Sequence, residues 1–199
     1  MNVYSSGMAK RNLVLLFILS FLVKSSLAAE FITAKNWPKF AGLEWGSSKE
    51  VVKDTLRKKG YKYLIEGKDK ISNLLIFSGE LIGQKVSVVA RLNQYGVKNL
   101  TTVEIIFEKS GKEYDIAGIA QKLIPILKKK YGEFRNVQED KYASAAWLES
   151  NSLAALVVYA PYSDELCVSY RSREHVIARN EFEKKEKQNR EKSEDENDF

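Results

Sequence analysis

Cysteine and histidine are nearly absent from this chain, which has one of each, Cys167 and His175, among 199 residues. A single cysteine excludes an intramolecular disulfide, so the fold has to be stabilised by its buried core. One cysteine and one histidine do not make the clustered donor set of a zinc site, and the dispersed acidic residues show no calcium-loop spacing. The sequence therefore predicts neither a metal nor another cofactor.

The chain also has no apolar run long enough to span a membrane. Its most apolar segment, residues 13–23, has eleven residues, whereas a spanning helix needs about 20. Basic residues precede this segment and the small residues 25–29 follow it, which is the plan of a secretory signal peptide. We expect cleavage after Ala28 or Ala29, which would leave no membrane anchor.

The same features indicate a compartment. No cysteine stands at the expected cleavage point, so a lipid-anchored lipoprotein is not expected. An exported chain poor in cysteine is typical of bacteria, so we expect a periplasmic or secreted bacterial protein. The formal net charge of +6 falls to +3 once residues 1–29 are removed. This positive charge is too thinly spread to indicate nucleic-acid binding.

Hydrophobic periodicity predicts two helices and eight strands. The helices start at Ser47 and at Asp115 and end at Gly60 and Gly132. The strands are expected over residues 61–65, 74–81, 85–93, 100–108, 133–137, 145–150, 153–161 and 165–172, with hairpin turns at 93–96 and 149–152. Several strands alternate apolar and polar residues, which is typical of antiparallel strands with one face toward solvent.

The order of these elements repeats, since each helix is followed by four strands. We therefore predict an α+β fold, with an antiparallel sheet, two helices on one face and a tandem duplication of the helix-plus-four-strand unit. The expected parts are a signal peptide (1–29), a first repeat (30–112), a second repeat sharing the same sheet (113–173) and a charged C-terminal helix or tail (174–199). Thirteen of the last nineteen residues are charged, and we expect the last eight to fray.

The stretch GLEWGSSKEVVKDTL, residues 42–56, resembles the helix start of small bacterial envelope proteins. The doubled helix-plus-four-strand plan resembles the architecture of the β-lactamase inhibitor protein. The order of a short helix followed by a small sheet is also similar to that of the assembly-factor lipoproteins of the outer membrane. The inhibitor protein has disulfides and the lipoproteins have a lipid-carrying cysteine, and this chain has neither. By analogy of fold, the resemblance implies a protein-binding module of the cell envelope.

Glycines and serines in this stretch could suggest a phosphate-binding loop. The spacing from Gly42 to Gly46 is one residue short of a Walker loop, lysine does not follow the second glycine, and Glu44 would repel phosphate. Ser47 and Glu50 instead have the spacing of a capping box, which predicts an ordinary helix start.

Candidate catalytic residues are few. His175 lies close in sequence to acidic residues and to Ser163, Ser169 and Ser172, but none of these stands in a recognised nucleophile turn. Cys167 falls on the less apolar face of its strand, where it could be a packed thiol or a reactive one. We expect a protein that is not an enzyme, and keep as an alternative an envelope hydrolase that uses His175.

Aromatic and basic residues give a candidate interaction surface, made of Trp37, Phe40, Trp45, Arg91, Arg171 and Arg173. Exposed aromatic residues suit the binding of another envelope protein, but the N-terminal aromatics could instead cover one end of the core. We expect a protein-interaction module, and keep as a further alternative a binder of a small ligand, lipid or glycan.

Overall fold

The computed structural model describes residues 37–108, 115–139, 142–148, 154–159 and 165–197. The expected signal peptide and the turn predicted at 149–152 lie outside the described residues. Within the described part of the chain, no helix is both long enough and apolar enough to cross a membrane.

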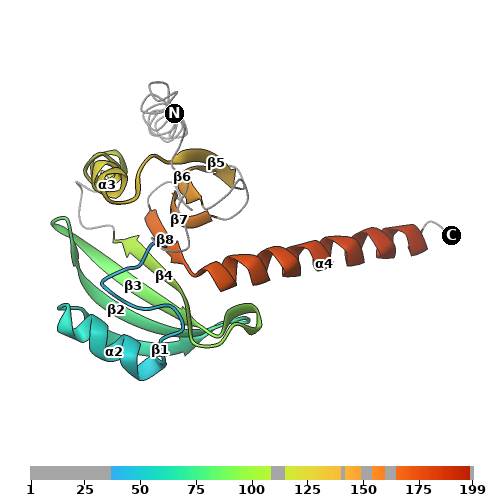
Figure 1. Ribbon diagram of the computed structural model, residues 1–199, viewed down its shortest axis with the longest axis horizontal. Coiled ribbons are helices and arrows are strands. Elements are labelled where there is room, and N and C mark those ends of the chain that lie inside the picture. Colours follow the sequence, from blue (N-terminus) through green and yellow to red (C-terminus); the bar gives the residue numbers. More distant parts are fainter. Residues whose placement is uncertain (1–36, 109–114, 140–141, 149–153, 160–164, 198–199) are drawn as a thin grey trace, which may run out of the picture.

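The described residues follow the predicted order of elements (Figure 1). In the first half, helix α2 (Lys49–Lys58) precedes strands β1 (Lys62–Lys68), β2 (Asn73–Leu81), β3 (Gln84–Leu92) and β4 (Leu100–Phe107), with a short 3-10 helix η2 (Gln94–Gly96) between β3 and β4. In the second half, helix α3 (Ile116–Tyr131) precedes strands β5 (Arg135–Glu139), β6 (Tyr142–Leu148), β7 (Ala154–Tyr159) and β8 (Leu166–Arg171). Helix α4 (Arg173–Asn197) follows.

All eight strands form one antiparallel sheet in the order β1-β2-β3-β4-β8-β7-β6-β5. The two halves meet where β4 pairs with β8, in a register that places Ile105 opposite Val168. From this central pair, each half runs outward in reverse chain order to its own edge strand. The predicted α+β class and antiparallel sheet are confirmed, whereas the origin of the two halves by duplication stays a prediction.

One face of the sheet carries the core, and the alternation along the strands decides which residues belong to it. On β3, Val86, Val88, Ala90 and Leu92 are buried in the core, while the intervening residues point to the other face. Buried residues of α2 and α3 join the same cluster, so both helices cover this face as predicted. The two helices contribute Val52, Leu56, Ile116, Ile119, Ala120, Leu123, Ile124 and Leu127.

Helix α2 starts one residue later than the capping-box prediction. Its N-cap is Ser48, whose hydroxyl accepts from the Val51 N–H at 3.5 Å. Ser47 is unavailable as the cap because its backbone pairs with the start of β4: the Leu100 N–H donates to the Ser47 carbonyl at 3.0 Å. The neighbouring Gly46 has a φ of 77° and donates its own N–H to the Leu100 carbonyl. The glycine therefore serves a tight turn joined to the sheet, and its N–H is not open to a phosphate.

Helix α4 begins against the body and then leaves it. Val176 is buried near its start, whereas every residue from Glu181 to Arg190 is exposed. Figure 1 shows the helix extending well away from the sheet. The helix runs as far as Asn197, whereas its composition predicted that the last eight residues would fray. Pairs one turn apart support it, such as Arg179 with Glu183 at 2.6 Å.

Candidate functional site

The structure buries half of the predicted interaction surface. Trp37 and Phe40 are buried in the core, and the Trp37 indole donates to the Arg171 carbonyl at 2.6 Å. Trp45 is half-buried and donates to the Pro38 carbonyl at 3.1 Å. These contacts agree with the alternative in which the N-terminal aromatics cover one end of the core. Trp37 and Phe40 are therefore not open to a partner, because their side chains are already packed.

Arg91 lies on the sheet face opposite α2 and α3, where two carboxylates neutralise it. Its guanidinium pairs with Asp69 and, at 2.8 Å, with Glu104. Burial opposes the charged form, but the two carboxylates outweigh it and raise the pKa of Arg91. Asp69 also accepts from the backbone N–H groups of Ile71 and Ser72. Through Asp69, Arg91 therefore helps to hold the loop between β1 and β2, including the backbone of Ile71.

The other two predicted arginines lie near the start of α4. Arg171 is buried at the end of β8, and its guanidinium donates to the Ser169 hydroxyl at 3.3 Å. Arg173 is exposed in the first turn of the helix. The six predicted residues therefore do not form one continuous surface, since Trp37, Phe40 and Arg171 are buried.

The candidate catalytic groups Cys167 and His175 are buried. Burial raises the pKa of the Cys167 thiol to about 12, so the thiol is protonated at neutral pH. Burial lowers the pKa of His175 to about 4, and the positive charges of Arg171 and Arg179 act in the same direction. The Nδ1 atom of His175 is buried and has no hydrogen-bond partner.

The serine hydroxyls near His175 take part in local structural contacts. Ser172 accepts from the backbone N–H of His175 at 3.1 Å, and Ser169 accepts from Arg171. Ser163 lies outside the described residues. Within the part of the chain that the structure describes, no three histidine, cysteine or acidic side chains gather as metal ligands.

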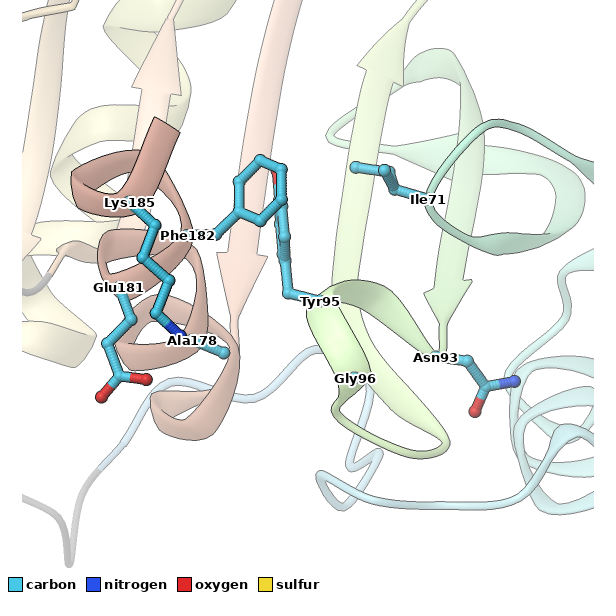
Figure 2. A pocket seen from close by; sticks show the side chains of 8 residues that line it. All are labelled: Ile71, Asn93, Tyr95, Gly96, Ala178, Glu181, Phe182 and Lys185. Carbon is cyan, nitrogen blue, oxygen red and sulfur yellow. The ribbon is translucent and has the colours of Figure 1, made fainter. Parts of the chain in front are cut away.

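A groove lies where α4 leaves the body, and we take it as the candidate site. It has a volume of about 400 Å³ and opens between α4, η2 and the loop after β1. Its lining residues, which define the α4–η2 groove, are Ile71, Asn93, Tyr95, Gly96, Ala178, Glu181, Phe182 and Lys185. Figure 2 shows the rings of Tyr95 and Phe182 side by side, with Ile71 across the opening and the Glu181 carboxylate directed away from them.

The apolar lining of the groove is unusually accessible. Ile71 is 43% exposed and Phe182 is 46% exposed, although both belong to residue types that are usually buried. Phe182 is also the only apolar residue between Ala178 and Phe199. Together with Tyr95, these two side chains give the groove an apolar lining.

Tyr95 has an unusual backbone conformation, and its ring contacts two other rings at the groove. Its φ of 50° lies in the left-handed region, which a residue with a side chain rarely adopts. The Tyr95 ring lies 5.5 Å from the His175 ring and 5.3 Å from the Phe182 ring, measured between centroids. Gly96, Asn93 and Asn99 in the same turn also have positive φ values, whereas Val97 has a φ of −78°. Such conformations persist where the surrounding structure enforces them, and they are frequent at binding sites.

The α4–η2 groove was not predicted from the sequence. The sequence predicted only a hairpin turn at 93–96. Tyr95 and Phe182 are far apart in the chain, and only the packing of α4 beside η2 brings them together. The one available signal was a lone phenylalanine within a highly charged run.

Comparison of the chain with protein-family models, with curated proteins and with solved structures finds no match. The function is therefore argued from the geometry of the groove.

Proposed function

We propose that this is a non-catalytic exported protein that binds another protein through the α4–η2 groove. The observation that carries the proposal is the exposure of Phe182 and Ile71 beside Tyr95, whose ring lies 5.3 Å from the Phe182 ring. Large aromatic side chains in a partly sheltered groove are the usual anchors of protein interfaces.

Contacts on both sides support the shape of the groove. On one side, the Arg91–Asp69 pair and the Asp69 contacts to Ile71 and Ser72 hold the loop after β1. On the other side, the buried His175 ring supports Tyr95. A rigid apolar site loses little conformational entropy on binding, so a small contact area can still give useful affinity.

The proposed location is the bacterial periplasm or the exterior. It rests on the signal-peptide pattern of residues 1–29 and on the single cysteine. Cys167 is a free, buried thiol in the sheet. The described core therefore contains no disulfide that would need an oxidising compartment to form.

A ligand-binding role is the second candidate, and the size of the groove favours it. A volume of about 400 Å³ falls within the range of small-molecule sites, roughly 300–1,000 Å³. A thermal-shift screen with envelope lipids, glycans and metabolites distinguishes the two functions, since a ligand selective for the folded state raises the melting temperature. The remaining alternative, a hydrolase using His175, has less support because this imidazole is buried.

Affinity capture with matched variants tests the proposal. The purified protein and a Phe182→Asp variant serve as baits in cross-linked envelope extract. Ile126→Asp is the control, because Ile126 is 50% exposed on α3 and takes no part in the groove. We expect the unmodified protein and the control to recover the same protein, and Phe182→Asp to lose it. Equal recovery by all three baits, or no specific recovery by any, would contradict the proposal.

A further inference from the structure

Strand β1 forms one edge of the sheet and lies beside α2 (Figure 1). Among the described strands, β2 is its only neighbour, so the outer side of β1 presents backbone N–H and C=O groups that no described strand pairs. A register shift between Tyr63 and Ile65 marks a bulge, which leaves Leu64 without a partner residue on β2. An edge of this kind can accept an extended segment as a further strand.

Basic side chains of α2 lie over one face of this edge. The Lys53 ammonium lies 4.4 Å and the Arg57 guanidinium 5.5 Å from the centroid of the Tyr63 ring on β1. One turn earlier on the helix, Lys49 pairs with Glu66 at 2.6 Å, and Lys53 reaches the same carboxylate at 3.6 Å. A single carboxylate therefore balances only part of the positive charge of three basic side chains.

The other face of the same edge is apolar. Leu75 and Phe77 on β2 are buried in the core, so Ile76 between them points to the face opposite α2. Ile65 is the register partner of Ile76 and shares that face, where its side chain is 60% exposed. Leu64, at the bulge, is 49% exposed. The edge of β1 is therefore basic on one face and apolar on the other.

These two faces specify the side chains of an incoming strand. Successive side chains of a strand point to opposite faces, so acidic residues at alternate positions would meet the basic side chains of α2. The apolar residues between them would meet Ile65. A second copy of β1 does not match, because residues 49–68 contain seven basic and three acidic side chains and would repel their like. The exposed Lys62 and Lys68 and the bulge are also features that oppose pairing between identical edges.

We propose that the outer edge of β1 binds an extended segment of another protein in which acidic and apolar residues alternate. The segment adds to the sheet as a further strand. Its carboxylates face Lys53 and Arg57, and its apolar side chains pack against Ile65 and Ile76. This surface goes beyond the proposed function, since no residue of β1 lines the α4–η2 groove.

A labelled peptide of alternating glutamate and valine, as long as β1, tests the chemistry of the partner. We expect fluorescence anisotropy to show that the purified protein binds this peptide. A peptide with lysine in place of glutamate should bind at least about tenfold more weakly, because its charges repel those of α2. Equal binding of the two peptides, or no binding of either, would overturn the inference.

Two N-methylated forms of the glutamate–valine peptide test whether it binds as a strand. The N–H groups of alternate residues in a strand point to opposite sides, so methylating all glutamate nitrogens or all valine nitrogens blocks different sides. One form should lose binding and the other should keep it, because only one side of the peptide pairs with β1. Equal binding by the two forms would contradict strand addition.

Variants of the protein locate the site. Arg57→Glu and Ile65→Asp should each weaken binding of the glutamate–valine peptide at least about tenfold. The control Lys129→Glu reverses an exposed charge on α3 and should bind normally, as should Phe182→Asp, which alters only the groove. Normal binding by both β1-edge variants would place the peptide elsewhere and overturn the inference. Sedimentation velocity showing a dimer that Ile65→Asp abolishes would identify a second copy as the occupant and would overturn it too.

Discussion

Acidification should destabilise this protein in part through one buried side chain, His175. The imidazole is only 4% exposed, and its Nδ1 has no hydrogen-bond partner. Burial lowers its pKa from 6.5 to about 4, and the nearby positive charges of Arg171, Arg179 and Arg91 act in the same sense. Protonation in the folded state would place a charge in an apolar site next to these arginines.

The sign and size of the effect follow from proton linkage. Between pH 6.5 and pH 4 the unfolded chain binds a proton at His175 and the folded chain does not. The stability contributed by neutral His175 is therefore complete above pH 6.5 and is lost as the pH falls toward 4. Between pH 7.5 and pH 4.5 the two pKa values correspond to a loss of about 2.5 kcal/mol in the free energy of unfolding.

Urea unfolding at both pH values, with a matched variant, isolates this contribution. His175→Phe keeps a ring against Tyr95 and removes the titrating group, while the carboxylates titrate alike in both proteins. We expect the unmodified protein to lose about 2.5 kcal/mol more than the variant between pH 7.5 and pH 4.5. Equal losses in the two proteins would refute the account of a buried, neutral His175.

Three further predictions concern the helix start, the sheet and the thiol. Ser48→Ala should lower the free energy of unfolding by about 0.5–1 kcal/mol, a modest loss because the N-cap hydrogen bond is long. Thermal melts measure this loss, and an unchanged melting temperature would show that Ser48 is not the cap. Gly79→Ala should cost about 1–3 kcal/mol, because the added Cβ would overlap the buried ring of Tyr61. Gly67→Ala is the control, since its nearest contact would be an ordinary 3.8 Å, and equal effects of the two changes would contradict this packing. Cys167 should resist a thiol reagent at pH 8 until urea unfolds the protein, and rapid labelling of the native protein would contradict a buried thiol of raised pKa.

The sequence predicted the strands well, because alternation and burial agree along them. Residues 85–93 and 100–108 were expected as strands and are observed at Gln84–Leu92 and Leu100–Phe107. Alternating residues that face a single core leave little freedom of register, since a shift by one residue would expose every apolar side chain. The helix start was less certain because Ser47 and Ser48 both suit a cap. Only the long-range pairing of Ser47 with Leu100 decides between them.

The groove could not be predicted, because it depends on tertiary packing. Tyrosine is not a residue that favours the left-handed conformation, so the sequence does not show that Tyr95 adopts it. The adjacent Gly96 indicates only an ordinary turn at this place. Val176 and His175 are buried and set the direction in which α4 leaves the sheet. Because the helix is highly charged and has no clear apolar face, its sequence does not show that these two residues are buried. Similarly, nothing local shows that Trp37 is buried, because its indole donates to a carbonyl 134 residues away.

Photo-cross-linking from the groove in living cells tests the central claim most directly. A photoreactive phenylalanine analogue is placed at residue 182, inside the α4–η2 groove, or at residue 126, an equally exposed apolar position on α3. We predict a discrete cross-linked protein product from residue 182 and none at the same mass from residue 126. Products that are the same from both positions, or absent from both, would contradict a protein-binding role for this groove.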